Sequence, residues 1–154
     1  MTSKSATSSS ATAKALDDME AVCRTRGERL TPQRRTVLEA LMVARRPLSA
    51  YELRDLLLPH DPSITPASVY RSLGFLMENN FVHRLETTRS FVACGHPDHA
   101  HAVQFLICRA CGTVVETEDS RVEAATASLG TRLGFEVDHR TVELTGICAD
   151  CRTA

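Results

Sequence analysis

The chain has 154 residues, of which 43% are hydrophobic and 24% charged, a composition that excludes a wholly disordered protein. No apolar run approaches the roughly 20 residues needed to cross a bilayer, so we expect no membrane partner. The net charge of −1 conceals an asymmetry: residues 1–84 carry 12 basic and 9 acidic residues, whereas residues 85–154 carry 6 and 10. A mildly basic half joined to an acidic half predicts two domains with different partners.

The N-terminal segment predicts a tail followed by a helix. Residues 1–14 are rich in Ser, Thr and Ala and lack the apolar segment of a secretory signal, so we expect a disordered tail. Apolar side chains then recur at helical spacing over residues 16–26. Cys23 lies on this apolar stripe and is predicted to be a small core residue.

Two further helices carry N-terminal capping signals. Thr31 followed by Pro32 predicts one helix start, because threonine can accept a hydrogen bond from an orphan N–H and proline suits the first helical position. Ser49 and Glu52 form a capping box that predicts the next start. This helix is expected to end before Pro59.

The next helix has an unusual exposed face. Thr65 and Pro66 repeat the capping signal, and the helix is expected to reach about Glu78. The face opposite its apolar stripe carries small residues around one tyrosine and one arginine: Ala67, Ser68, Tyr70, Arg71 and Gly74. An ordinary solvated face would carry more Glu and Lys, so this face is predicted to approach another molecule closely. Phe75 also falls toward this side, and we expect it to pack under the segment that follows.

Residues 81–86 and 90–94 predict two short strands that form a hairpin. Three helices followed by a hairpin, with a short connection between the second and third helices, favour a winged helix-turn-helix. In that fold the third helix enters the major groove of double-stranded DNA. The alternative is a plain three-helix domain with no role in nucleic-acid binding.

Six cysteines without a secretion signal favour metal ligands in a reducing cytosol over disulfides. Four of them form two CxxC knuckles, Cys108 with Cys111 and Cys148 with Cys151. Four thiolates can surround one zinc ion tetrahedrally in a structural site. The 36 residues between the knuckles predict intervening structure: a helix over residues 120–133 and a strand over residues 137–144. The alternative is a pair of redox dithiols.

A second metal site is indicated at the hairpin. If the hairpin loop is centred between Thr88 and Arg89, His83 lies opposite Cys94, with Cβ atoms about 5 Å apart. An imidazole and a thiolate at that distance can share one metal ion. Further possible donors follow in the sequence: His96, His99, His101 and Glu116. The alternative is a chance cluster of surface histidines beside a buried cysteine.

The sequence offers no catalytic arrangement, because HExxH, GxSxG and a phosphate-cradling glycine loop are all missing. Each metal site can be filled by four protein ligands, which leaves no open position for a substrate water. We therefore expect neither an enzyme nor a small-molecule substrate.

Several motifs occur together in a recognisable order: RLTPQR (29–34), PASVYRSL (66–73), the hairpin, CRACG (108–112) and CADC (148–151). Over residues 16–152 the chain resembles the ferric-uptake-regulator superfamily, and within it most closely the zinc-uptake-regulator branch. The resemblance implies a winged-helix repressor with a C-terminal α/β dimerisation domain, which binds palindromic operator DNA when loaded with metal.

The resemblance also implies roles for individual residues. Structural zinc falls on the four knuckle cysteines, Cys108, Cys111, Cys148 and Cys151. Regulatory zinc falls on His83, Cys94, His101 and Glu116, with His99 as a rival for His101. Tyr70 and Arg71, beside Ser68, match helix positions that meet DNA. Residues 102–107 are apolar where iron-type members carry a His-rich run, which favours zinc over iron.

We therefore predict an α+β protein. Its expected parts are a disordered tail (1–14), a winged-helix DNA-binding domain (15–94), a hinge (95–101) and a dimerisation and zinc-binding domain (102–154). The expected function is a cytoplasmic, homodimeric, zinc-responsive repressor of zinc uptake genes that holds two Zn²⁺ per chain. The alternatives are an iron- or peroxide-responsive regulator of the same superfamily or, from another class, a zinc-storage protein or zinc enzyme.

Overall fold

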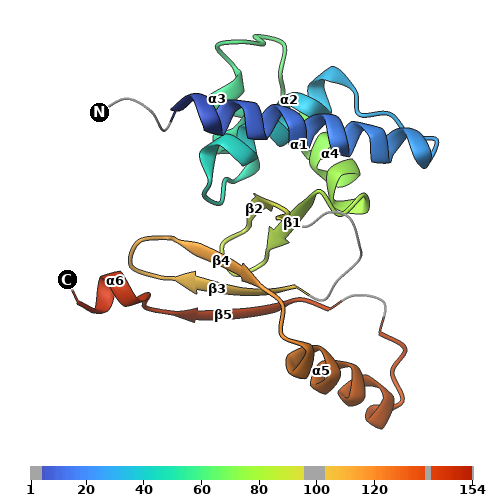
Figure 1. Ribbon diagram of the computed structural model, residues 1–154, viewed down its shortest axis with the longest axis vertical. Coiled ribbons are helices and arrows are strands. Elements are labelled where there is room, and N and C mark those ends of the chain that lie inside the picture. Colours follow the sequence, from blue (N-terminus) through green and yellow to red (C-terminus); the bar gives the residue numbers. More distant parts are fainter. Residues whose placement is uncertain (1–4, 96–102, 138–139, 154) are drawn as a thin grey trace. The chain divides into compact units, whose positions relative to one another are not determined.

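The computed structural model describes residues 5–95, 103–137 and 140–153, and the chain divides into two compact units, residues 1–98 and 99–154 (Figure 1). The first unit contains α1 (Ser5–Thr25), α2 (Pro32–Ala44), α3 (Ala50–Leu57), α4 (Pro66–Glu78), β1 (Val82–Leu85) and β2 (Ser90–Ala93). The second contains β3 (Gln104–Cys108), β4 (Val114–Thr117), α5 (Ser120–Leu133), β5 (Val142–Gly146) and α6 (Ala149–Arg152). The predicted α+β class is confirmed.

The predicted capping signals begin the helices of the first unit. The Thr31 side chain accepts from the backbone N–H of Arg34 at the start of α2. At the start of α3 the capping box is complete: the backbone N–H of Glu52 donates to Ser49 Oγ at 3.2 Å, and that of Ser49 donates to the Glu52 carboxylate at 2.8 Å. Thr65 caps α4 in the same way. Local sequence therefore determines where these three helices begin.

The first helix is longer than the sequence analysis predicts. It begins at Ser5, within the segment expected to be a disordered tail. Alanine, the strongest helix former, recurs through residues 6–15, and no Gly or Pro interrupts the run. Lys14 and Asp18 add an ion pair one turn apart at 2.8 Å. The helix therefore extends towards the N-terminus beyond Leu16, the first of its described side chains that is buried in the core.

One apolar cluster holds the first unit together. The four helices, the hairpin and the connections between them contribute nineteen buried residues to it, with Leu38, Leu53, Val69, Leu73, Leu76 and Phe81 at 0% exposure. Cys23 is also at 0% exposure and belongs to this cluster, as predicted. Burying one such large apolar side chain is worth roughly 1.5–3 kcal/mol, so the first unit has a core of its own.

The hairpin forms where predicted but in a different register. His83 pairs with Val92, and Leu85 pairs with Ser90, so the predicted pairing of His83 with Cys94 is wrong. The turn spans four residues, 86–89, and ends at Arg89 in the left-handed conformation (φ 51°). Leu48 exchanges two backbone hydrogen bonds with Phe91 in β2, at 3.0 and 2.8 Å. The connection between α2 and α3 therefore anchors the hairpin.

The second unit is built on a three-stranded sheet of order β4-β3-β5. The central strand β3 pairs antiparallel with β4 and parallel with β5. On one face Leu106 lies between Val115 and Leu144, and all three side chains are about half exposed. The sheet thus presents an apolar row, Leu106–Val115–Leu144, on its surface.

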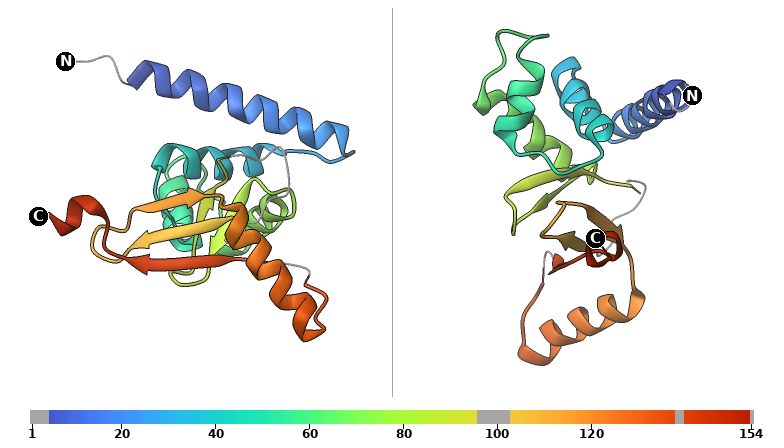
Figure 2. Two further views of the ribbon diagram at one scale, coloured as in Figure 1. Left: turned by 60° about the horizontal axis from the view of Figure 1, so that its bottom comes forward. Right: turned by 90° about the vertical axis from the view of Figure 1, so that its left-hand side faces the viewer.

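The connection from β4 to β5 contains the predicted helix, α5, but the following strand begins later than expected. At Gly134 (φ 73°) the chain leaves the helix, and Val137 then packs against Gly130, where an added Cβ would lie 2.5 Å from the valine Cγ2. Val137 therefore lies against α5, and β5 begins only at Val142. Figure 2 shows α5 projecting from the sheet, and Gly130 is its one buried residue.

None of the helices in the described part of the chain has the length and hydropathy that a membrane-spanning helix requires.

Candidate metal centre and nucleic-acid interface

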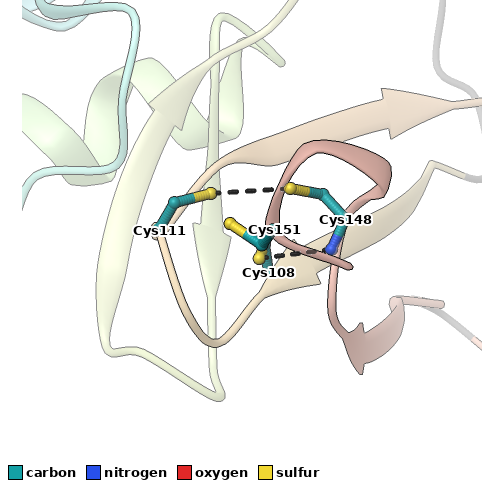
Figure 3. A group of neighbouring side chains, drawn as sticks. All are labelled: Cys108, Cys111, Cys148 and Cys151. Carbon is teal, nitrogen blue, oxygen red and sulfur yellow. Dashed lines mark hydrogen bonds between the residues drawn. The ribbon is translucent and has the colours of Figure 1, made fainter. Parts of the chain in front are cut away.

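The parallel pairing of β3 with β5 brings the two CxxC knuckles together (Figure 3). Cys108 ends β3 and pairs with Gly146 at the end of β5, so the chain reaches Cys148 two residues further on. The first knuckle is closed by backbone hydrogen bonds between Cys108 and the residues at its far side, including Gly112 N–H to Cys108 O at 2.9 Å. Gly112 makes this turn at φ 74°.

The geometry of the four thiols fits a tetrahedral metal. The Sγ atoms of Cys108, Cys111, Cys148 and Cys151 all lie within 4.8 Å of one another, and none forms a disulfide. The Sγ atoms of Cys111 and Cys148 are 3.8 Å apart. Four sulfurs at the usual zinc–sulfur distance of about 2.3 Å form a tetrahedron with edges of about 3.8 Å. The cluster can therefore enclose one zinc ion with little movement.

The surroundings shift the pKa values of three of these thiols, two downward and one upward. The backbone N–H of Cys148 donates to Cys108 Sγ at 3.3 Å, and with further N–H donors it lowers the pKa of Cys108 to about 6. The hydroxyl of Thr113, 3.2 Å from Cys111 Sγ, lowers the pKa of Cys111. The neighbouring thiols raise the pKa of Cys151 to about 12. Four clustered thiols cannot all ionise unless a cation balances their charge, so the donor set is suited to a cation.

Two predicted ligands of the second metal site lie together on the hairpin. His83 and Cys94 are on the same face, because Cys94 follows Val92, the partner of His83, by two residues. A ring nitrogen of His83 and Cys94 Sγ lie within 4.8 Å of each other. The shift of register therefore keeps the pair together as diagonal neighbours instead of direct partners.

The other predicted ligands of this site are placed less fully. His96, His99 and His101 lie outside the described residues. Glu116 belongs to β4 of the second unit, where it pairs with Phe105 and is partly buried.

Apart from Ser68, the predicted residues of the exposed face of α4 are exposed or partly exposed. Tyr70 is half exposed, and its ring meets that of Phe91 edge-on at a centroid distance of 6.5 Å. Arg71 is exposed, and its side chain makes no hydrogen bond or ion pair within the described residues. The glycine at position 74 has open space where a side chain would begin. The face therefore presents one free guanidinium and one positioned phenol on a surface that another molecule can approach closely.

Ser68 has a different place from the one predicted. It is 8% exposed, and its hydroxyl accepts from Gln33 Nε2 and from the backbone N–H of Thr65 while donating to the Thr65 carbonyl. One donor and two acceptor positions exhaust a hydroxyl. The Ser68 side chain therefore belongs to the helix cap, which argues against a contact with DNA.

Two side chains were missed by the sequence analysis. The guanidinium of Arg34 lies over the ring of Phe75, with Cζ 3.6 Å from the ring centroid, a contact that the sequence analysis did not predict for Phe75. Gln33 reaches the first turn of α4. Both residues belong to the RLTPQR motif, which could have drawn attention to them. The spacing of apolar residues, however, predicted no contact for either side chain.

The chain is similar to known metal-dependent regulators. Residues 25–145 match the sequence profile of the ferric uptake regulator family. The zinc uptake regulation protein of Escherichia coli (strain K12) is 40% identical over 143 residues, which cover 91% of this chain and 82% of that protein. The corresponding protein of Mycobacterium tuberculosis is 35% identical, with 82% and 97% covered. A solved structure of a zinc uptake regulator complexed with zinc and DNA is 39% identical, covers 92% of this chain and 95% of its own, and superposes with a TM-score of 0.89.

Proposed function

Because the chain belongs to the ferric uptake regulator family, we propose that it is a zinc-responsive transcriptional repressor that binds operator DNA and controls zinc uptake. The observation that carries the proposal is the presence in one chain of two features, the exposed Tyr70–Arg71 face of α4 and the four-cysteine cluster. The similarity to zinc uptake regulation proteins, one of them solved with zinc and DNA, supports zinc as the sensed metal.

The four cysteines hold a structural zinc ion. A shell of four thiolates is closed to water and substrate, so this ion serves folding and not chemistry. The lowered pKa values of Cys108 and Cys111 favour the ionised thiolates that zinc requires.

A second, regulatory zinc ion is held by His83, Cys94, His101 and Glu116. The proximity of His83 to Cys94 on the hairpin supports this assignment, and the resemblance to zinc-type regulators supplies the other two ligands. Two zinc ions per chain follow. A metal with two ligands on the hairpin and two beyond it links the winged helix to the second unit.

The protein acts as a homodimer whose DNA-binding domain comprises residues 15–94 and whose dimerisation domain comprises residues 102–154, joined by a hinge over residues 95–101. The exposed apolar row Leu106–Val115–Leu144 supports the proposal that a second copy packs against this sheet, because exposed apolar surface is more stable when it is buried in an interface. The chain works in the cytoplasm, where its operators lie, and it has no catalytic role.

Regulation follows from geometry. Two α4 helices of a dimer can enter successive major grooves only when they are spaced about 34–36 Å apart. Regulatory metal need only favour the arrangement with that spacing, and a coupling of about 1–3 kcal/mol would change operator affinity roughly 5- to 150-fold.

The test is operator affinity with and without added zinc. The operator is a duplex that the zinc-loaded protein selects from a random pool. Cys94→Ala should keep the dimer and the four-cysteine zinc but lose the zinc stimulation of binding. Cys23→Ala, which removes a buried cysteine that belongs to neither group of possible ligands, should keep this stimulation. Equal stimulation of wild type and Cys94→Ala would contradict the regulatory site. Stimulation by iron(II) but not by zinc would contradict zinc sensing.

A further inference from the structure

The segment of residues 26–34, which comprises the connection after α1 and the first residues of α2, contacts α4 at its first turn. Gln33 Nε2 donates to Ser68 Oγ at 3.0 Å, and both side chains are at least partly buried. The hydroxyl of Ser68 is also engaged with the backbone of Thr65 on both its donor and acceptor sides. Gln33 is thus fixed to a hydroxyl that cannot rotate without breaking the cap of α4.

The same segment contacts the middle of α4. The guanidinium of Arg34 lies over the ring of Phe75, with Cζ 3.6 Å from the ring centroid, and its Nη1 donates to the Arg29 carbonyl at 2.7 Å. A stacked guanidinium with one fixed hydrogen bond has a defined orientation, which an ammonium group on a flexible stem would not keep.

A third contact lies at the last turn of α4. Arg26 Nη1 donates to Asn79 Oδ1 at 3.1 Å. Asn79 is 2% exposed, and its Nδ2 donates to the Phe75 carbonyl at 3.1 Å. The C-terminal end of α4 is therefore fixed to the same connecting segment.

The three contacted residues form one stripe on α4. Phe75 and Asn79 follow Ser68 by seven and eleven positions. At 3.6 residues per turn, both therefore project from the helix axis within about 20° of the direction of Ser68. Arg71 precedes Phe75 by four residues and is its neighbour one turn away. Holding this stripe therefore determines the direction in which Arg71 projects.

We propose that Gln33, Arg34 and Arg26 are positioning residues for operator recognition. They fix the rotation of α4 about its axis and thereby direct Arg71 and Tyr70 at the base edges. This assigns a role to the RLTPQR motif, which contains no Cys, His, Asp or Glu that could bind a metal, and it rests on the proposed DNA-binding function.

Variants of Arg34 distinguish a positioning role from direct binding to DNA. If Arg34 contacted a phosphate, lysine would serve nearly as well, because a phosphate contact requires charge. If Arg34 positions α4 through Phe75, lysine should fail, and removing the ring should have the same effect as removing the guanidinium.

The experiment measures binding of the selected operator duplex and of a scrambled duplex at several salt concentrations, for Arg34→Lys, Phe75→Leu and the double variant. Each single variant should weaken operator binding about 3- to 30-fold, the size of a partly desolvated cation–π contact, with scrambled DNA and the salt slope unchanged. The double variant should be no weaker than either single one. Arg24→Lys is the matched control, because Arg24 is exposed and its side chain makes no hydrogen bond or ion pair within the described residues.

Two results would overturn the proposal. The first is that Arg34→Lys keeps full operator affinity while Arg34→Gln loses affinity for both duplexes equally. If the salt slope of Arg34→Gln is also smaller by about one, Arg34 contacts a phosphate. The other is unchanged amide hydrogen exchange across α4 in Arg34→Lys, since a helix released from the segment should exchange faster. The exchange measurement needs no DNA, so it tests the contact even if wild type selects no operator, an outcome that would instead refute the proposed function.

Discussion

The two units bury their apolar side chains to different degrees. In the first unit nineteen residues from every helix, the hairpin and the connections between them form one buried cluster. Of the residues described in the second unit, Val103, Phe105, Ile107 and Cys108 are the buried hydrophobic ones, whereas larger side chains are exposed: Leu106, Val115, Leu129, Leu133, Phe135, Val137, Leu144 and Ile147. The first unit therefore has a core of its own, whereas in the second unit the proposed metal ion and second copy would add to a smaller core.

The largest expected effect comes from the metal centre. Cys108→Ser removes one of four ligands, and since structural zinc contributes about 10–16 kcal/mol to folding, the second unit should unfold and the dimer dissociate. The helical signal of the first unit should survive. Zinc content and sedimentation velocity measure the result, with Cys23→Ser as a control that keeps its zinc. A stable Cys108→Ser dimer with unchanged zinc would rule out this site.

The next effect concerns the apolar row. Leu106→Glu places a carboxylate in the middle of the proposed dimer face, where an unpaired buried charge costs about 3–5 kcal/mol per copy. The dimer should dissociate while the four-cysteine zinc is retained. Val43→Glu, at a valine of the first unit that is 65% exposed, should leave the dimer intact. Equal dimer dissociation constants for the two variants would refute the assignment of this face.

Arg71 tests the first unit's role in recognition. Arg71→Ala should weaken operator binding by about 1–3 kcal/mol if the guanidinium reads a guanine, and it should relax sequence preference. If the guanidinium instead binds phosphate, affinity for all sequences should fall alike and the salt slope should decrease by about one. Gel shifts on selected and scrambled duplexes at two salt concentrations distinguish these outcomes. No loss on either duplex would remove α4 from the interface.

The smallest effect is at the capping box of α3. Ser49→Ala should lower the free energy of unfolding by about 0.5–2 kcal/mol, whereas Thr36→Ala in the exposed middle of α2 should lower it less.

The capping box also predicts a pH dependence, because the backbone N–H and hydroxyl of Ser49 lower the pKa of Glu52. Glu52 therefore stabilises the fold above its unfolded pKa of about 4.3, and this contribution is lost as the pH falls through the lowered folded value. Glu52→Gln should flatten the acid side of the stability profile in urea titrations, and an unchanged profile would contradict the box.

The sequence predicts the first unit better than the second because its signals are local. Thr31, Ser49 and Thr65 each determine a helix start through hydrogen bonds to residues three positions away. The strand expected over 137–144 starts late because Val137 packs on Gly130, a tertiary contact that no pattern of alternation reveals. Strand β4 was not predicted, since its pairing with β3 is also tertiary.

The same distinction applies to the sites. The four cysteines were predicted because CxxC spacing encodes its own geometry, and the thiols do lie together. The pairing partner of His83 was wrong because hairpin register depends on the turn, and Arg89 in the left-handed conformation ends a four-residue turn. The contact of Arg34 with Phe75 joins residues 41 positions apart and left no periodic signal.

The parallel pairing of β3 with β5 also affects the order of folding. Parallel neighbours cannot be joined by a tight turn, so β4 and α5 must be completed before Cys108 meets Cys148. Contacts so distant in sequence form slowly, whereas the helices of the first unit rest on near-neighbour contacts and form quickly. On the ribosome the winged helix should therefore be folded before the second knuckle has been synthesised. In a zinc-starved cell a newly made chain would have a folded DNA-binding domain and an incompletely folded dimerisation domain. The zinc supply would therefore also determine how many chains become functional repressors.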